Sequence, residues 1–381
     1  MKKTALGLVV AGLLMGCNSS DKVSDDEITL GEKGKEEYLT FTAGDVHWVT
    51  VGDLMPTQRT LGLLQNDYKL GRWQLEEEKR FEEFCETYGL RDSVDYYDEH
   101  SDFNDPDSFV CKDPRESDGI ISEDQNSVER IMSWVNPVIV GPDGSLYLTD
   151  GHHTFSRFHD MVDGGKNTQV LVRVEGNFAY DADDNRINMD EFWQKMQETK
   201  NVYLFDNGNA IEPSDLPKDL GAVNESNPHG LINDDYRGLV YYTRDIGWHK
   251  GSAESIPFLE YYWAEELRDT IRVDNADTIE KYVQVVLDAS RYMVGLPNYY
   301  VLGESGKTTT ELGQLPELEF NDTQSVIEEI VCEWDEDDAA DGKLKLGKLG
   351  WAFYQTGTDI EDFPYPCNSV SDYENRYDLS R

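Results

Sequence analysis

The sequence predicts an α+β protein, in which a small mixed sheet with helices is followed by a mainly helical region. Two observations predict this class. Up to about residue 180, short apolar strands alternate with helix-spaced apolar residues, and from residue 189 onward aromatic and aliphatic residues recur mostly at helical spacing. The expected parts, in chain order, are a signal peptide (1–16), a flexible tether (17–40), a sheet domain (41–180), a helical region (181–310) and an acidic disulfide-containing tail (311–381).

The first residues predict an export signal. Two lysines precede an apolar run that is too short to span a bilayer as a stable helix. The run ends at Leu14, Gly16 and Cys17, which resembles the lipobox of bacterial lipoproteins. That resemblance implies that Cys17 carries a lipid anchor, that the polar segment after it is a tether, and that Asn18 directs the protein to the outer membrane of a Gram-negative cell. The alternative is a soluble secreted protein cleaved near Gly16.

Four cysteines remain after Cys17: Cys85, Cys111, Cys332 and Cys367. An even number in an exported chain predicts disulfides. Proximity in sequence favours Cys85 with Cys111 and Cys332 with Cys367, although three pairings are formally possible. Each bond would stabilise the fold by roughly 3 to 4 kcal/mol in the chain-entropy model. A thiol nucleophile is the weaker interpretation, because no cysteine stands beside a candidate base.

The charge of the chain excludes one class of partner. Asp and Glu number 76 against 34 Lys and Arg, a formal net charge of −42. Nonspecific nucleic-acid binding is not expected, because the phosphate backbone demands a basic surface. A local site can still hold one phosphate. The simplest reason for such acidity is solubility, in a salty medium or with divalent cations.

The sheet domain is expected to begin with strands at 38–43 and 47–51, the second leading into a loop marked by proline and glycine. A helix over 75–88 should bury Phe81 and Phe84 on one face. The acidic stretch 92–124 is expected to be an irregular insertion.

A hairpin followed by a helix is the strongest local signal. Apolar strands at 138–140 and 146–148 flank a turn signal at 142–144, and Gly151 lets the backbone swing into a helix. A helix and a strand complete the domain, at 154–162 and 170–172.

The later elements are mostly helices whose aromatic residues are expected to be core. A hairpin signal at Asn207 and Gly208 interrupts them. A capping-box pattern at 277–280 opens the last helix, which should stop before Pro297. The acidic run 333–341 is interpreted as a solvated loop. The two remaining helices are expected at 189–198 and 255–268.

The candidate site is the pair His152 and His153, which comes directly after Asp150 and Gly151 at the predicted helix start. Free N–H groups and the positive dipole end favour an anion there, and imidazoles act as acids, bases or donors near neutral pH. The alternative is structural, with one histidine capping the helix and the other packing against the sheet.

Three motifs in order, at 53–58, 137–144 and 150–153, resemble the ParB/sulfiredoxin superfamily and most closely its branch of ParB-like nuclease proteins. Segments at 235–239, 256–268 and 295–297 resemble the segments C-terminal to the motif in that branch, so the resemblance covers about 47–300. It implies a ParB/sulfiredoxin-like domain that holds nucleotide phosphates at the helix start, then a family-specific helical region. Members include nucleotide-dependent DNA clamps, sulfinic acid reductases, a free-serine kinase and proposed nucleases.

By this resemblance, Gly151, His152, His153 and Thr154 form the phosphate-facing turn, and Asp150 orients a histidine or a divalent metal. Sulfiredoxins have a cysteine where His152 stands, so reductase activity is not expected. Many members have arginine where Thr154 stands, which weakens the expected phosphate clamp.

Two arginines are candidates to replace that clamp. Arg157 lies four residues after His153, on the same helix face. Arg59 lies in the loop after the first motif, and its alternative interpretation is an exposed loop arginine. A further cluster at 181–185 is similar to a calcium loop, but Arg186 occupies its glycine position, so a solvated turn is favoured.

Two functional hypotheses remain. The first is an envelope lipoprotein that hydrolyses or transfers a phosphoryl group on a small phosphate ester, nucleotide or nucleic-acid end. His152 or His153 would be acid or base, Arg157 the charge stabiliser and Asp150 the orienter or metal ligand. The second is a non-catalytic ligand-binding or scaffold lipoprotein. The enzyme requires both histidines in an open cleft with Asp150 and Arg157, whereas a buried, satisfied pair favours the scaffold.

Overall fold

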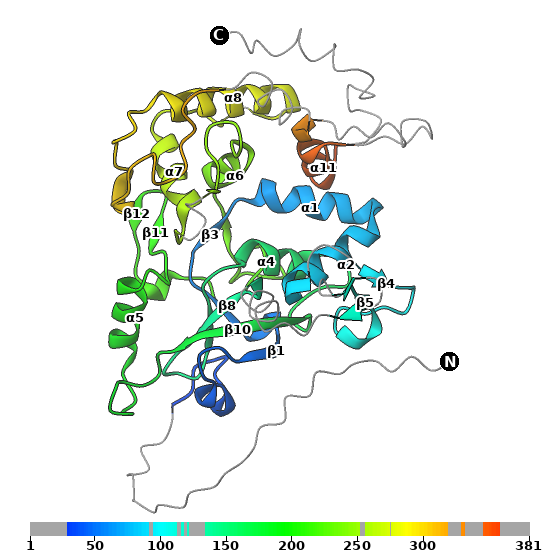
Figure 1. Cartoon of the computed structure of the whole chain (residues 1–381), viewed down its shortest axis with the longest axis vertical. Coiled ribbons are helices and arrows are strands. Elements are labelled where there is room, and N and C mark those ends of the chain that lie inside the picture. Colours follow the sequence, from blue (N-terminus) through cyan, green and yellow to red (C-terminus); the bar gives the residue numbers. More distant parts are fainter. Residues whose placement is uncertain are drawn as a thin grey trace, which may run out of the picture.

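The structure is a computed structural model that describes residues 29–90, 94–112, 116–117, 120–121, 134–251, 256–274, 276–318, 329–331 and 346–358. The sheet lies toward one end of the molecule (Figure 1). Helices α6 (Asp235–Tyr242), α7 (Leu259–Arg268) and α8 (Ile279–Gly295) lie toward the other end, with α1 (Leu63–Leu75) and α4 (His152–Asp160) between them. Cys17, Cys332, Cys367 and the acidic run 333–341 lie outside the described residues.

Five strands form the main sheet, in the spatial order β1-β10-β8-β9-β2. The bounds of these strands are Val46–Thr50 for β1, Gln169–Asn177 for β10, Pro137–Val140 for β8, Leu146–Leu148 for β9 and Leu54–Pro56 for β2. The β1–β10 and β8–β9 pairs are antiparallel, whereas the β10–β8 and β9–β2 pairs are parallel. The predicted α+β class with a small mixed sheet is therefore confirmed.

The β8–β9 hairpin, which the sequence predicted, presents α4 to the rest of the domain. Val138 pairs with Leu148, and both are fully buried. Asp143 accepts a hydrogen bond from the backbone N–H of Ser145 (3.1 Å), and Gly144 has a φ of 72°, a value that favours glycine. The chain leaves β9 and enters α4 within four residues, because β9 ends at Leu148 and α4 begins at His152.

Helices α1, α2 (Glu77–Cys85) and α4 share an aromatic core over the sheet. The ring centroids of Phe84 and Phe158 lie 3.9 Å apart, and those of Phe81 and Phe103 lie 4.5 Å apart. A disulfide joins Cys85 at the end of α2 to Cys111. The predicted pairing of these two cysteines is confirmed.

The second core lies among α6, α7 and α8 and buries Trp248, Trp263 and Leu287. Helix α11 (Lys348–Gln355) packs against α1, where a Cβ on Gly71 would lie 2.1 Å from the carbonyl oxygen of Trp351. Part of the segment expected to be an acidic tail is therefore a packed helix, because Trp351 and Ala352 are apolar enough to be buried there.

The remaining described elements are short. Helix α5 spans Met189–Glu198, as predicted from its periodicity. Four pairs of short strands are present among them: β3 (Thr60–Leu61) with β13 (Ile232–Asn233), β4 (Val94–Tyr96) with β5 (Val110–Cys111), β6 (Glu116–Ser117) with β7 (Ile120–Ile121), and β11 (Phe205–Asp206) with β12 (Asn209–Ala210). The single turns η1 to η5 and η7 are Glu36–Thr40, Val51–Asp53, Glu86–Leu90, Pro106–Ser108, Pro213–Asp215 and Gly303–Ser305.

Two expectations near the N-terminus are corrected. The segment 38–43, expected to be a strand, contains most of the 3₁₀ turn η1, because Tyr38 and Leu39 are both buried and a strand would point adjacent side chains to opposite faces. The expected tether does not remain free as far as residue 40. Lys33 pairs with Asp219 (3.1 Å), so this part of the chain is fixed to the domain.

Three helix bounds also differ from expectation. The helix expected at 75–88 is α2 followed by the turn η3. A break at Glu76, where φ is −118° and ψ is 76°, separates α2 from α1, which ends at Leu75. Helix α4 begins two residues before the expected start, so both histidines are helical. Helix α7 begins at Leu259 rather than at residue 255, after Phe258 in a left-handed conformation. Within the described residues, no helix is both long and apolar enough to cross a bilayer.

Candidate functional site

The two histidines are the first residues of α4, and a glycine makes this start possible. Gly151 has a φ of 88°, and a Cβ there would lie 2.4 Å from the side-chain oxygen of Asn136. Only glycine fits such a position without strain. Asp150 precedes it, and its carboxylate accepts a hydrogen bond from the Gly151 N–H (2.7 Å).

Both imidazoles point their Nε2 atoms at the loop between β2 and α1. His152 Nε2 accepts from the Thr57 N–H (3.0 Å), and His153 Nε2 accepts from the Gly62 N–H (3.1 Å). His152 is 3% exposed, and burial lowers its pKa to about 3. Burial together with the charge of Arg237 holds the pKa of His153 well below its usual range. Both rings are therefore neutral at pH 7.

This geometry fixes what each histidine can do. Because Nε2 accepts a hydrogen bond, the proton of each neutral ring is on Nδ1. His153 can donate Nδ1–H to a ligand oxygen, whereas His152 is almost fully buried, and neither ring has a free lone pair for use as a general base. A base role for His152 or His153 would first require the loop hydrogen bond to break.

Arg157 lies in a buried ion pair. Its guanidinium contacts the Glu83 carboxylate and donates to Thr154 Oγ1 (3.0 Å) and Asn66 Oδ1 (3.3 Å). Lys69 Nζ also lies 2.9 Å from Glu83. Although burial opposes ionisation of Glu83, these two cations hold its pKa at about 2. Arg157 is thus already paired with Glu83, and the Thr154 hydroxyl already accepts a hydrogen bond from Arg157. Neither group is free to clamp a phosphate.

Arg59, the second candidate clamp, is also paired elsewhere. Its Nε lies 3.0 Å from Asp206 Oδ2, and its NH1 donates to the Asp215 carbonyl (3.2 Å). The structure brings Asp150, Gly151 and His153 together, but neither predicted arginine joins them with a free charge.

Four charged residues that sequence reasoning did not single out gather at this helix start instead. Glu260 Oε1 lies 3.1 Å from Arg244 NH2, 3.8 Å from Arg237 NH2 and 3.9 Å from Lys250 Nζ. The charges of Arg237 and Arg244 act on His153, and those of Glu260, Lys250 and Arg237 act on Asp150. We name this group the α4 site: Asp150, His153, Arg237, Arg244, Lys250 and Glu260.

Solvent reaches the α4 site. The side chains of Lys250, Arg244 and Glu260 are 42%, 27% and 15% exposed. Asp150 is exposed, yet the protein around its carboxyl raises its pKa by desolvation, with the charge of Glu260 adding to this. Burial opposes ionisation of Glu260, but the neighbouring cations keep its pKa low. Glu260 is therefore ionised, and Asp150 takes up a proton more readily than an ordinary aspartate.

Arg237 is the most buried cation of the site, at 6% exposed. Its NH1 donates to Gln65 Oε1 (3.2 Å), while NH2 lies too far from Glu260 for a hydrogen bond. The sequence did hold a signal that could have identified Arg237 and Glu260, because each is a charged residue among the apolar residues of its helix. Arg237 precedes Gly238 and Leu239 in α6, and Glu260 lies among the aromatic residues of α7.

Metal ligation receives no support from the part of the chain that the structure describes. Among those residues, no three His, Cys, Asp or Glu side chains converge as a metal site. In the former calcium-loop candidate, Asp181 accepts hydrogen bonds from the N–H groups of Asp183 (2.8 Å) and Asn185 (2.9 Å), which forms a local turn.

Comparison with known proteins identifies the family. A model described as "Putative ParB-like nuclease" matches residues 47–269, more than half of the chain. The chain belongs to this family. All six residues of the α4 site lie inside the matched range of the ParB-like nuclease domain. No curated protein matches the chain.

Among solved structures, the chain is similar to protein Atu1540 from Agrobacterium tumefaciens. The identity is 19% and the TM-score is 0.40, over 65% of this chain and 91% of that one.

Proposed function

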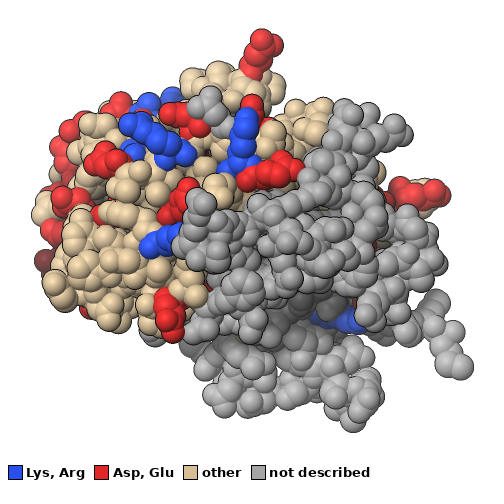
Figure 2. Space-filling model, turned by 90° about the horizontal axis from the view of Figure 1, so that it is seen from above, with Lys and Arg blue, Asp and Glu red and all other residues tan. Residues whose placement is uncertain are grey.

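We propose that this ParB-like nuclease family member binds a phosphate ester, a nucleotide or a nucleic-acid end at the α4 site and hydrolyses it or transfers its phosphoryl group. One observation carries the proposal: Arg237, Arg244 and Lys250 gather around Glu260, close enough for their charges to act on His153 or Asp150 at the start of α4, in a chain whose acidic residues outnumber its basic residues by 76 to 34. Figure 2 shows one face of the described surface, where acidic side chains accompany the basic ones. A local gathering of cations is the arrangement that a phosphate requires.

The chain supplies donors for each phosphate oxygen. The first N–H groups of α4 and the Nδ1–H of His153 can donate to non-bridging oxygens. Arg237 NH2, Arg244 and Lys250 supply positive charge, and Glu260 holds these cations together when no phosphate is bound. Their separations of 3.1 to 3.9 Å from Glu260 leave them able to turn toward a second anion.

Asp150 is the group best suited to take up a proton. It is exposed, it lies beside the helix start, and its pKa is raised, so its carboxylate can accept a proton from an attacking water or hydroxyl. His153 then acts as a neutral donor to developing negative charge. This assignment replaces the acid or base role that the sequence suggested for the two histidines.

The rival function is a non-catalytic ligand-binding or scaffold lipoprotein. Its support is specific: His152 is buried and hydrogen-bonded, and Arg157 is held by Glu83. The rival predicts binding without turnover.

A turnover assay separates the two. The full chain is incubated with bis(p-nitrophenyl) phosphate, ATP and a short DNA duplex, with and without Mg²⁺ or Mn²⁺. We expect turnover of at least one substrate that falls about 100-fold or more in Asp150→Asn. Lys250→Gln removes a half-exposed cation and should raise KM, while Lys218→Gln, the loss of an exposed lysine elsewhere, is the matched control. Binding without turnover supports the ligand-binding form of the rival. No binding of any phosphate compound contradicts the enzyme and favours the scaffold form.

We also propose that the protein is lipid-anchored in the cell envelope through Cys17. The Cys85–Cys111 disulfide supports an oxidising compartment. Cys17→Ser should move the protein from the membrane to the soluble fraction. If the variant still sediments with membranes after a high-salt wash, this anchor is wrong.

A further inference from the structure

A cavity separate from the α4 site lies beside the β11–β12 hairpin. Its volume is about 270 Å³. It is bordered by the hairpin turn, by α7 and by η7, and it shares no residue with the α4 site. The residues that border it include Tyr203, Phe205, Tyr262, Glu265, Glu266 and Glu304.

The chemistry of this wall is unusual, because it combines three aromatic rings with three carboxylates and no Lys or Arg. Tyr203, Phe205 and Tyr262 supply the rings, and residues 265, 266 and 304 supply the carboxylates. The three carboxylates repel an anionic ligand. The faces of aromatic rings and nearby carboxylates both attract a cation.

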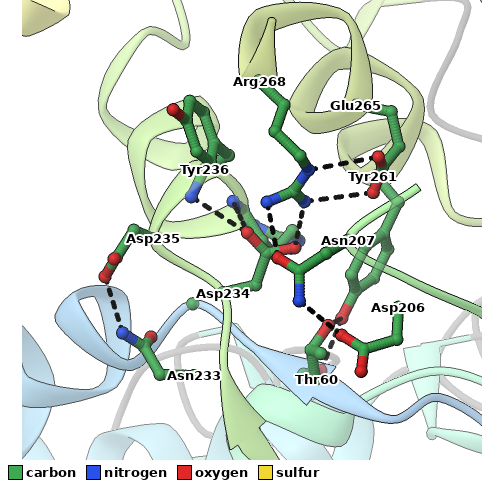
Figure 3. Close-up of polar contacts among 12 residues, drawn as sticks. Thr60, Asp206, Asn207, Asn233, Asp234, Asp235, Tyr236, Tyr261, Glu265 and Arg268 are labelled. Atoms are coloured by element: carbon green, nitrogen blue, oxygen red, sulfur yellow. Dashed lines mark hydrogen bonds and ion pairs between the residues drawn. The ribbon is translucent and has the colours of Figure 1, made fainter. Parts of the chain in front are cut away.

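Arg268 fixes the position of the Glu265 carboxylate through two hydrogen bonds (Figure 3). Arg268 donates from Nε and NH2 to the two Glu265 oxygens (3.2 and 3.0 Å), and the same NH2 donates to Asp234 Oδ2 (2.9 Å). Its NH1 donates to Asn207 Oδ1 in the hairpin turn (2.8 Å). One cation therefore serves two carboxylates, so the group keeps a negative charge while Nε, NH1 and NH2 of the arginine are all engaged.

Glu266 and Glu304 have no cation partner among the described residues. Glu266 Oε1 accepts from the Tyr292 hydroxyl (2.6 Å), which positions the carboxylate without neutralising it. Glu304 is exposed at the rim of the cavity. Lys200 lies close by, but its Nζ is directed at the Ser305 carbonyl (3.5 Å).

Tyr203 shows that the aromatic part of the wall has a polar group to offer. It is 6% exposed, and its ring lies 4.6 Å from that of Tyr261 and 5.5 Å from that of Phe205. Its hydroxyl makes no hydrogen bond within the described part of the chain, and the residue borders the cavity. A ligand that accepts or donates a hydrogen bond here would satisfy it.

Gly208 keeps the carboxylate side of the cavity open. It has a φ of 75°, and a Cβ there would lie 3.0 Å from Glu265 Oε2. The turn therefore favours glycine, and a side chain at this position would press on the Glu265 carboxylate.

From these observations we propose that the cavity binds an organic cation, an alkylammonium or guanidinium group, between the aromatic rings and the carboxylates of residues 265, 266 and 304. The cation can belong to a small amine or to the side chain of a basic peptide, since both present the same group. This site goes beyond the phosphate chemistry proposed above and does not depend on it.

Isothermal titration of the full chain at physiological salt tests the proposal. The probes are choline, cadaverine, agmatine and the tripeptide Gly-Lys-Gly, and the neutral control is 3,3-dimethyl-1-butanol, which has the shape of choline without its charge. We expect at least one cation to bind at least about tenfold more tightly than the neutral control. Tighter binding of the tripeptide than of cadaverine identifies a peptide source, and the reverse identifies a small amine. Equal binding of choline and its neutral analogue, or no binding of any cation, overturns the proposal.

Variants of the wall distinguish this cavity from the generally acidic surface. Glu266→Gln keeps an acceptor for Tyr292 but removes the charge, and Tyr262→Leu removes a ring face; each should weaken cation binding about fivefold or more. Tyr262→Phe keeps the face and should bind nearly as the parent. Glu225→Gln removes one exposed carboxylate outside the cavity and is the matched control for charge. Equal losses in Glu225→Gln and Glu266→Gln would show only surface attraction and would overturn the site, and thermal melts verify that each variant is folded.

Discussion

Two groups of basic side chains lie near α4, and they differ in how firmly their charges are held. In the first, Lys69 and Arg157 contact Glu83, and the side chains of Arg157 and Glu83 are 4% and 8% exposed. In the α4 site, three cations surround Glu260 at 3.1 to 3.9 Å, and exposure reaches 42% at Lys250. In each group the cations outnumber the carboxylate between them. Excess charge therefore does not by itself mark a ligand site; solvent access and loose pairing do.

The largest expected effect comes from breaking the buried group. Arg157→Met should lower the free energy of unfolding by about 3 to 5 kcal/mol, because Glu83 loses a contact that burial makes necessary. Urea denaturation measures this. Arg237→Met in the α4 site should destabilise by less, since Glu260 keeps Arg244 and Lys250. Equal losses in the two variants would remove the distinction between the groups.

The pH dependence of stability tests the buried group. The pKa of Glu83 is about 2 in the folded protein, against an ordinary value of 4.5 when unfolded. A lowered carboxyl pKa contributes stability above the unfolded value, and that stability is lost as the pH falls from 4.5 toward 2. Glu83→Gln should flatten the stability curve in this range. A curve that keeps the parent slope there would show that Glu83 is not the group that titrates.

The two histidines should also differ in their contribution to stability, but by less than the two charged groups. His152→Ala leaves the Thr57 N–H without an acceptor in a buried position, which should cost about 1 to 3 kcal/mol. His153 is less buried, so water can replace it at Gly62, and His153→Ala should cost less. Thermal melts at pH 7 compare the two. A larger loss for His153→Ala would contradict this ranking.

The sequence predicted those features whose signal lies within a short stretch of chain, but not the contacts between residues far apart in the sequence. The β8–β9 hairpin and α5 were predicted because turn residues and periodicity lie within a short stretch of chain. The spacing of His153 and Arg157 predicts a shared helix face, but it carries no information that Glu83, from α2, occupies that arginine. Likewise, Arg237 and Glu260 reach Asp150 only through packing of elements that are far apart in sequence.

The smallest effect concerns the exposed edge of the α4 site. By linkage, inorganic phosphate at about 100 times its Kd should raise the free energy of unfolding by about 2.7 kcal/mol, and by less as salt increases. Lys250→Gln should leave the stability without phosphate within about 0.5 kcal/mol of the parent, because the Lys250 side chain is half-exposed, yet reduce the phosphate effect. Lys218→Gln, the matched exposed lysine, should change neither. Differential scanning fluorimetry over a phosphate series measures this. An undiminished phosphate effect in Lys250→Gln would mean that the anion binds elsewhere, and the loosely paired group would then be no more functional than the buried one.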